Sequence, residues 1–348
     1  MMSPRERVLA AIDRKRTDRA PADYQAWPSV TTRLIARLGL KDQEALLQAL
    51  GVDMRRAAVN YYLPASKPDA DGYVRDMWGA RTRPEPRADG KPNRISPFSE
   101  GTTVDDVHAH AWPDPSGLDF SDSIRQFKAL QPDYATYGAP WCPFFHEAGW
   151  LIGQENFYVW MGTKPGVVEA IVNRIVDYEV EATRRFFEEA AGCVDIAYFG
   201  NDFGTQRGLF VSPAMYDQFL RRPLKRFFDT ARSFGCRVMQ HSCGAVRGLI
   251  PSFIEDGVDI LDPIQVRAAD MALDGLIRDF GSRLVFHGGV DTQETLPFGT
   301  PADVRGQVRG YRELTRAKGG YLLCGSQELI DDIPLDNILA MYDENQKG

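Results

Sequence analysis

The second half of the chain alternates between two kinds of segment with a regularity that few folds allow. Short apolar runs rich in β-branched and aromatic residues are each followed by a turn and by a stretch with helical periodicity. Strands of a parallel sheet are buried on both faces, so they read as continuous apolar runs, and helices connect them. The alternation predicts an α/β fold whose strands in this half are residues 194–199, 237–240, 258–261, 283–286 and 321–323.

The first half adds three weaker candidate strands, at residues 20–25, 54–59 and 134–137. Together with the later runs they reach the eight strands that close a (β/α)8 TIM barrel. Residues 61–118 are rich in Pro, Gly and Asp and show little periodicity. We therefore expect one barrel domain over residues 1–348, with residues 61–118 forming an irregular N-terminal excursion over one end of the barrel.

Composition excludes several classes of protein. The 41 Lys and Arg residues against 48 Asp and Glu residues give a net charge of −7, whereas a nucleic-acid-binding protein has a basic excess. No apolar run approaches the roughly 18 residues of a membrane helix. The five cysteines are odd in number and widely spread, which favours a reducing compartment over a disulfide framework. The composition predicts a cytoplasmic protein with no nucleic-acid or membrane partner.

Polar side chains follow each predicted strand of the second half at the point where the apolar run ends. The carboxyl ends of the strands in a parallel barrel meet at one rim, where active sites lie. Polar groups are costly to bury without partners, so stability alone does not explain their repeated placement there. The residues in question are Asn201, Asp202, His241, Cys243, Asp262, Gln265, His287, Asp291, Cys324 and Gln327.

The His241-Ser242-Cys243 sequence is the sharpest of these signals. Residues two apart on an extended segment project to the same face, so the imidazole and the thiol lie together. Both are ligands that zinc prefers, and a third ligand from another strand would leave one position open. Cys324, at the end of the last predicted strand, is the natural third ligand. The alternative, weighed equally, is a buried free cysteine beside a hydrogen-bonded histidine.

Asp202 and His241 are the candidate catalytic acid and base. Asp202 has alternative roles as a metal ligand, as a partner that orients His241, or as the side chain of an Asx turn. Asp291 can equally cap the short segment that follows it, and His287 can simply pack or bond locally. The candidate substrate-binding residues are Asn201, Asp262, Gln265, His287, Asp291 and Gln327.

Several of these motifs together resemble the uroporphyrinogen decarboxylase-like superfamily. The resemblance covers nearly the whole chain and implies the same (β/α)8 barrel. The matching stretches are residues 201–209, 212–213, 241–244, 257–265, 287–293, 319–321 and 333–338, with 5–8 and 18–21 near the N-terminus.

The superfamily has two main activities. The decarboxylases carry an arginine- and glycine-rich motif near the N-terminus, and residues 22–28 here lack it. The corrinoid-dependent methyltransferases bind zinc through His-x-Cys and a later cysteine, which His241 and Cys243 match. In the family pattern the later cysteine falls slightly beyond Cys324, where this chain has Gln327. The third ligand is therefore Cys324, Gln327 or Glu328, or the metal is absent.

The resemblance implies a zinc-dependent methyltransferase that moves a methyl group between a small methylated substrate or a thiol and a corrinoid protein. The chain contains no corrinoid-binding D-x-H-x-x-G sequence, so the cobalt cofactor would come with that partner protein. A homodimer is compatible with this reading. The alternatives are a metal-free decarboxylase or lyase of the same fold, and a non-catalytic protein that binds a tetrapyrrole or a corrinoid.

Overall fold

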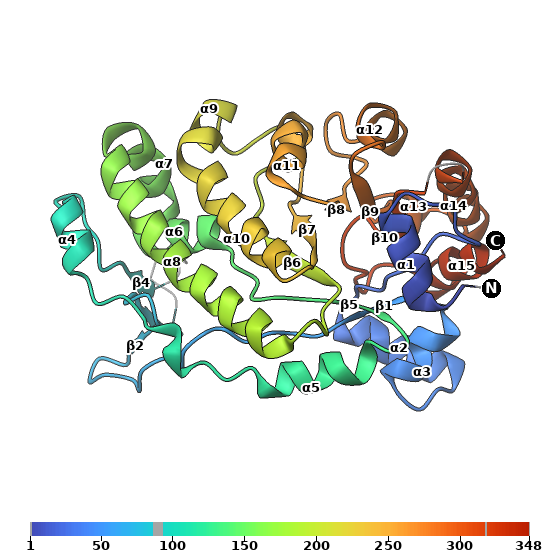
Figure 1. Cartoon of the computed structure of the whole chain (residues 1–348), viewed down its shortest axis with the longest axis horizontal. Coiled ribbons are helices and arrows are strands. Elements are labelled where there is room, and N and C mark those ends of the chain that lie inside the picture. Colours follow the sequence, from blue (N-terminus) through green and yellow to red (C-terminus); the bar gives the residue numbers. More distant parts are fainter. Residues whose placement is uncertain (1, 86–92, 317–318, 348) are drawn as a thin grey trace.

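The computed structural model describes residues 2–85, 93–316 and 319–347. Its centre is a curled parallel sheet of seven strands in the order β1-β5-β6-β7-β8-β9-β10. Helices cover the outside of the sheet and follow one another around it in sequence order (Figure 1). The strands are β1 (Met54–Arg56), β5 (Ala135–Tyr137), β6 (Ile196–Gly200), β7 (Arg237–His241), β8 (Ile260–Ile264), β9 (Val285–Val290) and β10 (Tyr321–Gly325).

The predicted strands of the second half are confirmed, but all of them run further than the apolar pattern indicated, β6 and β7 by one residue and the other three by two to four residues. β8, β9 and β10 continue past residues 261, 286 and 323, where the sequence turns polar or glycine-rich. As a result Asp262, His287 and Cys324 lie inside strands and expose only 1%, 0% and 2% of their surface. These three residues therefore sit deeper in the barrel than the rim on which we expected them.

The expected eighth strand does not form a continuous ladder. The segment from residue 20 to residue 26 makes isolated parallel bridges at Ala22 and Ala26 on the β10 side, and Asp53 N donates to Ala22 O at 2.8 Å beside β1. Pro21 has no N–H to donate, which limits the ladder this segment can build. The described residues thus form a seven-stranded sheet bridged by an extended segment, and a complete ring of eight strands is not shown.

The helices begin and end at the residues that helix chemistry favours. Thr300 accepts a hydrogen bond from Asp303 N before Pro301, and Ser212 does the same for Met215 N. The longer helices are α1 (Pro4–Ile12), α2 (Pro28–Leu38), α3 (Gln43–Ala49), α5 (Ser121–Leu130), α6 (Phe144–Ile152), α7 (Gln154–Thr163), α8 (Pro165–Ala190), α10 (Arg222–Ser233), α11 (Ile250–Asp256), α12 (Leu273–Phe280), α14 (Pro301–Thr315) and α15 (Leu335–Gln346). The shorter helical segments are α4 (Val104–Ala109), α9 (Pro213–Met215), α13 (Thr295–Phe298), η1 (Pro115–Gly117), η2 (Tyr216–Arg221) and η3 (Arg247–Leu249).

The excursion contains more regular structure than its composition predicted. The short strands β2 (Val74–Arg75), β3 (Arg81–Arg83) and β4 (Asn93–Ile95) form a three-stranded antiparallel sheet. Arginines in these strands pair with acidic residues of the neighbouring turns, as Arg94 does with Asp76 at 2.8 Å. Strands of two or three residues are too short to leave a periodic signal in the sequence.

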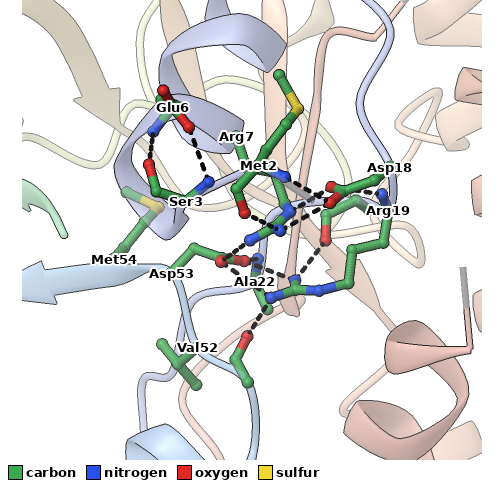
Figure 2. Close-up of polar contacts among 12 residues, drawn as sticks. Met2, Ser3, Glu6, Arg7, Asp18, Arg19, Ala22, Val52, Asp53 and Met54 are labelled. Atoms are coloured by element: carbon green, nitrogen blue, oxygen red, sulfur yellow. Dashed lines mark hydrogen bonds and ion pairs between the residues drawn. The ribbon is translucent and has the colours of Figure 1, made fainter. Parts of the chain in front are cut away.

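Helix α1 closes the end of the barrel where the strands begin. Its apolar residues Val8, Ala11 and Ile12 pack against interior residues of the strands. Just before β1, the fully buried Asp53 accepts from Arg7 Nη1 and Arg19 Nη1, both at 2.6 Å (Figure 2). Every charge in this group is paired, so these residues have a structural role. The candidate functional site lies at the opposite end of the barrel.

None of the described helices is both long and apolar enough to cross a bilayer.

Candidate metal centre

Three potential metal ligands meet at the carboxyl ends of β6 and β7. Asp202 follows β6, His241 is the last residue of β7, and Cys243 lies two residues further on. His241 Nε2 is 3.4 Å from Cys243 Sγ and 3.3 Å from Asp202 Oδ1. The three ligand atoms lie within 4.8 Å of one another, and all three residues are partly exposed. We call Asp202, His241 and Cys243 the rim cluster.

Two glycine-containing loops hold the rim cluster in shape. Cys243 N donates to Asp202 Oδ1 at 2.9 Å, and Gly244 N donates to Gln265 Oε1 at 2.8 Å. Gly244 has φ +84°, and a Cβ there would approach the Gly204 backbone to 2.4 Å. The loop after β7 can pass this close to the loop after β6 only because both positions lack a side chain.

Asp262 orients the imidazole of the rim cluster from below. Its Oδ2 lies 2.8 Å from His241 Nδ1 and 2.5 Å from the Tyr198 hydroxyl, which donates to it. With Nδ1 bonded to a buried carboxylate, Nε2 is left to face Asp202 and Cys243. A carboxylate behind a ligating histidine is the usual support of a metal-binding imidazole, because it fixes the tautomer and the ring orientation.

Electrostatics favour the charged forms of His241 and Asp202 when no metal is bound. Burial opposes an imidazolium, but hydrogen bonds to Asp202 and Asp262 outweigh it and raise the pKa of His241 well above its usual value. Burial likewise opposes ionisation of Asp202, yet the hydrogen bond from His241 holds the pKa of Asp202 well below its usual range. A metal ion would displace the proton shared by this group, so metal binding and proton release are coupled here.

A second group of the same residue types lies one layer deeper. Asp23, His287 and Cys324 also have ligand atoms within 4.8 Å of one another, but all three are buried. His287 Nδ1 is 2.5 Å from Asp262 Oδ1, and His287 Nε2 is 3.2 Å from Asp23 Oδ2. We call Asp23, His287 and Cys324 the buried cluster.

Both ring nitrogens of His287 are occupied by carboxylates. Although burial disfavours the imidazolium, the charges and hydrogen bonds of Asp262 and Asp23 raise the pKa of His287 to about 9. Burial also raises the pKa of the Cys324 thiol well above its usual value. All three residues of the buried cluster are closed off from solvent, whereas those of the rim cluster are partly exposed, so the buried cluster forms an ionic core with no path for an entering ion.

The structure therefore does not bring together the predicted set of His241, Cys243 and Cys324. Cys324 belongs to the buried cluster because β10 extends to Gly325 and carries the cysteine inside the barrel. The side chain that reaches the rim cluster from this strand is that of Gln327, whose Nε2 lies 3.2 Å from Cys243 Sγ. Glu328 turns away and accepts a hydrogen bond from Trp27 Nε1 at 3.2 Å.

The other predicted site residues are engaged with the protein itself. Asn201 is buried and bridges the backbone, accepting from Phe145 N and donating to Cys142 O. Asp291 accepts from Gln293 N and from Arg267 Nε, both within 2.9 Å, which is the capping role we weighed equally with a site role. Asn201, Gln265 and Asp291 hold the loops of the site, and their contact with a substrate stays a prediction.

Sequence reasoning missed three residues around the site. Asp23 and Tyr198 lie within predicted strands, where only the alternation of inward-facing positions distinguishes them from packing residues. Arg56 ends β1 and follows another arginine, and nothing in the sequence around it distinguishes it from Arg55. His146 also lies beside the rim cluster: Asp202 N donates to its Nε2 at 3.0 Å.

Comparisons with known proteins agree with this architecture. A methyltransferase from Methanosarcina mazei superposes with a TM-score of 0.67 at 18% identity, over 100% of this chain and 99% of that chain, which shows a shared fold. A D-tagatose 3-epimerase-like protein reaches only a TM-score of 0.35 at 12% identity, over 70% of this chain and 91% of that chain. No curated protein matches the sequence. The sequence model described as uroporphyrinogen decarboxylase (URO-D) matches residues 90–347, well over half of the chain, and the protein therefore belongs to the uroporphyrinogen decarboxylase family.

Proposed function

We propose that the protein is a zinc-dependent methyltransferase that moves a methyl group between a small substrate and a corrinoid carried by a partner protein. The observation that carries the proposal is the geometry of the rim cluster, which combines imidazole, thiol and carboxylate donors at the open end of the barrel. Three protein ligands with a free fourth position are typical of catalytic zinc, whereas structural zinc sites use four protein ligands.

The spacing of the donors fits a tetrahedral zinc ion. Zinc bonds of about 2.0 Å to nitrogen and oxygen and about 2.3 Å to sulfur set ligand-to-ligand distances of about 3.3 Å and 3.5 Å. The corresponding distances from His241 Nε2 are 3.3 Å to Asp202 Oδ1 and 3.4 Å to Cys243 Sγ. The orienting hydrogen bond from Asp262 supplies the outer support that such sites use.

In this proposal Asp202, His241 and Cys243 hold the ion, and Gln327 donates a hydrogen bond to the sulfur. Zinc bound there would ionise a coordinated substrate thiol near neutral pH, or polarise the leaving group of a methyl ether or amine. Asp262 holds the His241 imidazole in its orientation, and His146 accepts a hydrogen bond from the backbone N–H of Asp202. The exposure of the rim cluster leaves its fourth position accessible from outside the barrel.

Two further observations support methyl transfer. The Methanosarcina mazei protein with the same fold is described as a methyltransferase. The stretch at residues 22–28 lacks the arginines by which the decarboxylases grip their substrate. A corrinoid is too large for the barrel interior, so the open rim would receive it together with its partner protein.

A metal-free decarboxylase is the second candidate. It is favoured by the continuous chain of hydrogen-bonded groups that runs from Asp202 through His241, Asp262 and His287 to Asp23. Such a chain can hold a proton at His241 and deliver it to a carbanion at the rim. In that role Asp202 and His241 are the acid and base, and zinc has no part.

A single-turnover experiment separates these functions. Zinc-loaded and metal-stripped protein are each mixed with methylcobalamin and a small thiol, and the loss of the methyl–cobalt absorption is followed. The proposal predicts methyl transfer that requires zinc and disappears in Cys243→Ala. Transfer at an equal rate without zinc would contradict it, and a cobalamin spectral change without transfer would indicate a binding protein.

A further inference from the structure

Arg56 is a cation without a counter-ion next to the rim cluster. It ends β1 and is exposed, and among the described residues it makes no ion pair and no hydrogen bond. Its guanidinium lies 5.2 Å from the centre of the Tyr198 ring and 5.6 Å from that of the Trp141 ring. Nearly every arginine around it in the sequence, such as Arg55 with Glu44, is already paired.

Arg56, Trp141 and Tyr198 line one small cavity of about 90 Å³, together with residues 57–59 and 138–139. Two of the residues that line the cavity, Trp141 and Tyr198, also lie next to His241 of the rim cluster. The Trp141 ring is 5.3 Å from the His241 ring, and the Tyr198 hydroxyl is 3.2 Å from His241 Nδ1. A molecule in this cavity therefore lies one aromatic ring away from the proposed metal ligands.

The anionic groups near this cavity are already committed to other partners. Asp262 lies between His241 and His287, and Asp23 accepts from Tyr137 and pairs with His287. Neither carboxylate forms an ion pair with Arg56, whose N–H groups stay available in a protein of net charge −7. A guanidinium held against aromatic faces presents its remaining N–H groups in a planar fork that matches a carboxylate.

We propose that this cavity binds the carboxylate of the substrate and that Arg56 is its anchor. The substrate class is then a small carboxylic acid whose methyl-bearing oxygen, sulfur or nitrogen extends from the cavity toward Cys243. The inference rests on the proposed function for the position of the reacting group. A single cation in so small a space favours a carboxylate, because a phosphate dianion draws on more donors.

Two matched probes test the anchor. Methoxyacetate carries a methyl ether and a carboxylate, and methoxyacetamide is its neutral counterpart; inorganic phosphate is the third probe. Binding to the zinc-loaded protein is measured by calorimetry or by ligand-observed NMR. We expect methoxyacetate to bind at least tenfold more tightly than either methoxyacetamide or phosphate.

Substitutions locate the effect on the side chain. Arg56→Gln should weaken methoxyacetate binding by roughly tenfold to a hundredfold, and Arg56→Lys by less, because lysine keeps the charge but loses the fork. Arg37→Gln, at an exposed arginine of α2, is the matched control and should bind as the unmodified protein does. Arg56 does not contact the rim cluster, so the zinc content should be unchanged in all three variants.

The outcomes separate this inference from the proposed function. Equal binding of the acid and the amide, tighter binding of phosphate, or full affinity in Arg56→Gln would overturn the carboxylate subsite, whatever the zinc content. Loss of acid binding in Arg56→Gln with zinc retained would support it. Absence of zinc together with Arg56-dependent acid binding would reject the metal proposal and keep the subsite.

Discussion

The rim cluster and the buried cluster are built from the same three residue types, yet their chemistry differs. In the rim cluster His241 has one nitrogen bonded to Asp262, while its other nitrogen faces a thiol and a carboxylate at the surface. In the buried cluster both nitrogens of His287 are bonded to buried carboxylates. Asp262 joins the two clusters, one oxygen to each imidazole.

This comparison shows that the identity of the residues does not by itself define a metal site. Each imidazole lies between two carboxylates, so the clusters differ in exposure: a metal needs a path for entry, and only the partly exposed rim cluster provides one. In the buried cluster His287 bonds to Asp23 and to Asp262, which stabilises the barrel and positions Asp262. The following predictions test that division of roles, from the largest expected effect to the smallest.

Replacing the sulfur of each cluster should have opposite effects on metal content. Cys243→Ala removes one of three ligands and should reduce zinc from about one per chain to below about 0.2 per chain. Cys324→Ala removes a buried thiol that faces no open position, so zinc content should stay near one per chain. Metal analysis after gel filtration measures both. Equal zinc loss in the two variants would mean that the clusters do not differ as described.

Breaking the buried ion pair should affect stability far more than metal binding. Asp23→Asn leaves His287 without one of its two carboxylates and should lower the free energy of unfolding by about 3–5 kcal/mol. Asp202→Asn is the matched control, since its side chain is 35% exposed and its loss should change stability by less than about 1 kcal/mol. Urea unfolding measures both, and a larger loss in Asp202→Asn would reverse the assignment.

The buried cluster also predicts a pH dependence of stability. The pKa of His287 is about 9 in the folded protein, against about 6.5 in an unfolded chain. The imidazolium therefore stabilises the fold fully below about pH 6.5, and this contribution, on the order of 3 kcal/mol, is lost as the pH rises through 9.

Unfolding free energies at pH 6 and pH 9.5 measure this loss. His287→Gln lacks the titrating group, so its stability should change less over the same interval than that of the unmodified protein. A decline of the same size in both proteins would assign the pH dependence to other groups.

Adding a sulfur beside Cys243 should strengthen the rim cluster. Gln327 Nε2 already lies 3.2 Å from Cys243 Sγ, so Gln327→Cys places a second thiol near the ion. We expect zinc affinity to rise by roughly tenfold, measured by competition with a chromophoric chelator, because thiolates are strong zinc ligands. Gln327→Ala should bind zinc about as well as the unmodified protein. Weaker binding in Gln327→Cys would show that residue 327 does not face the ion.

Much of the fold could be predicted from the sequence, because parallel strands buried on both faces leave an uninterrupted apolar signal. The positions at which β8, β9 and β10 end could not be predicted in this way. Asp262, His287 and Cys324 read as the start of a loop, since polar residues rarely continue a buried strand. Inside the barrel Asp262 bonds to His287, and Cys324 lies within 4.8 Å of that imidazole, an arrangement that becomes visible only when the strands are placed side by side.

The mispredicted strand ends also explain how much of the site could be predicted. The pair His241 and Cys243 follows from the two-residue repeat of an extended segment, which needs no tertiary information. The third ligand depends on which residues of other strands lie beside His241 and Cys243. An error of a few residues in a predicted strand end therefore places Cys324 there, where the structure has Asp202 and Gln327. Arg56 carries no motif, and its unpaired charge is a property of the folded barrel alone.

The most direct test of the rim cluster is anomalous diffraction at the zinc absorption edge from crystals of the zinc-loaded protein. We predict a single strong peak within about 2.0–2.3 Å of His241 Nε2, Cys243 Sγ and an Asp202 carboxylate oxygen. No peak at the carboxyl ends of β6 and β7, or a peak between His287 and Cys324, would contradict the account.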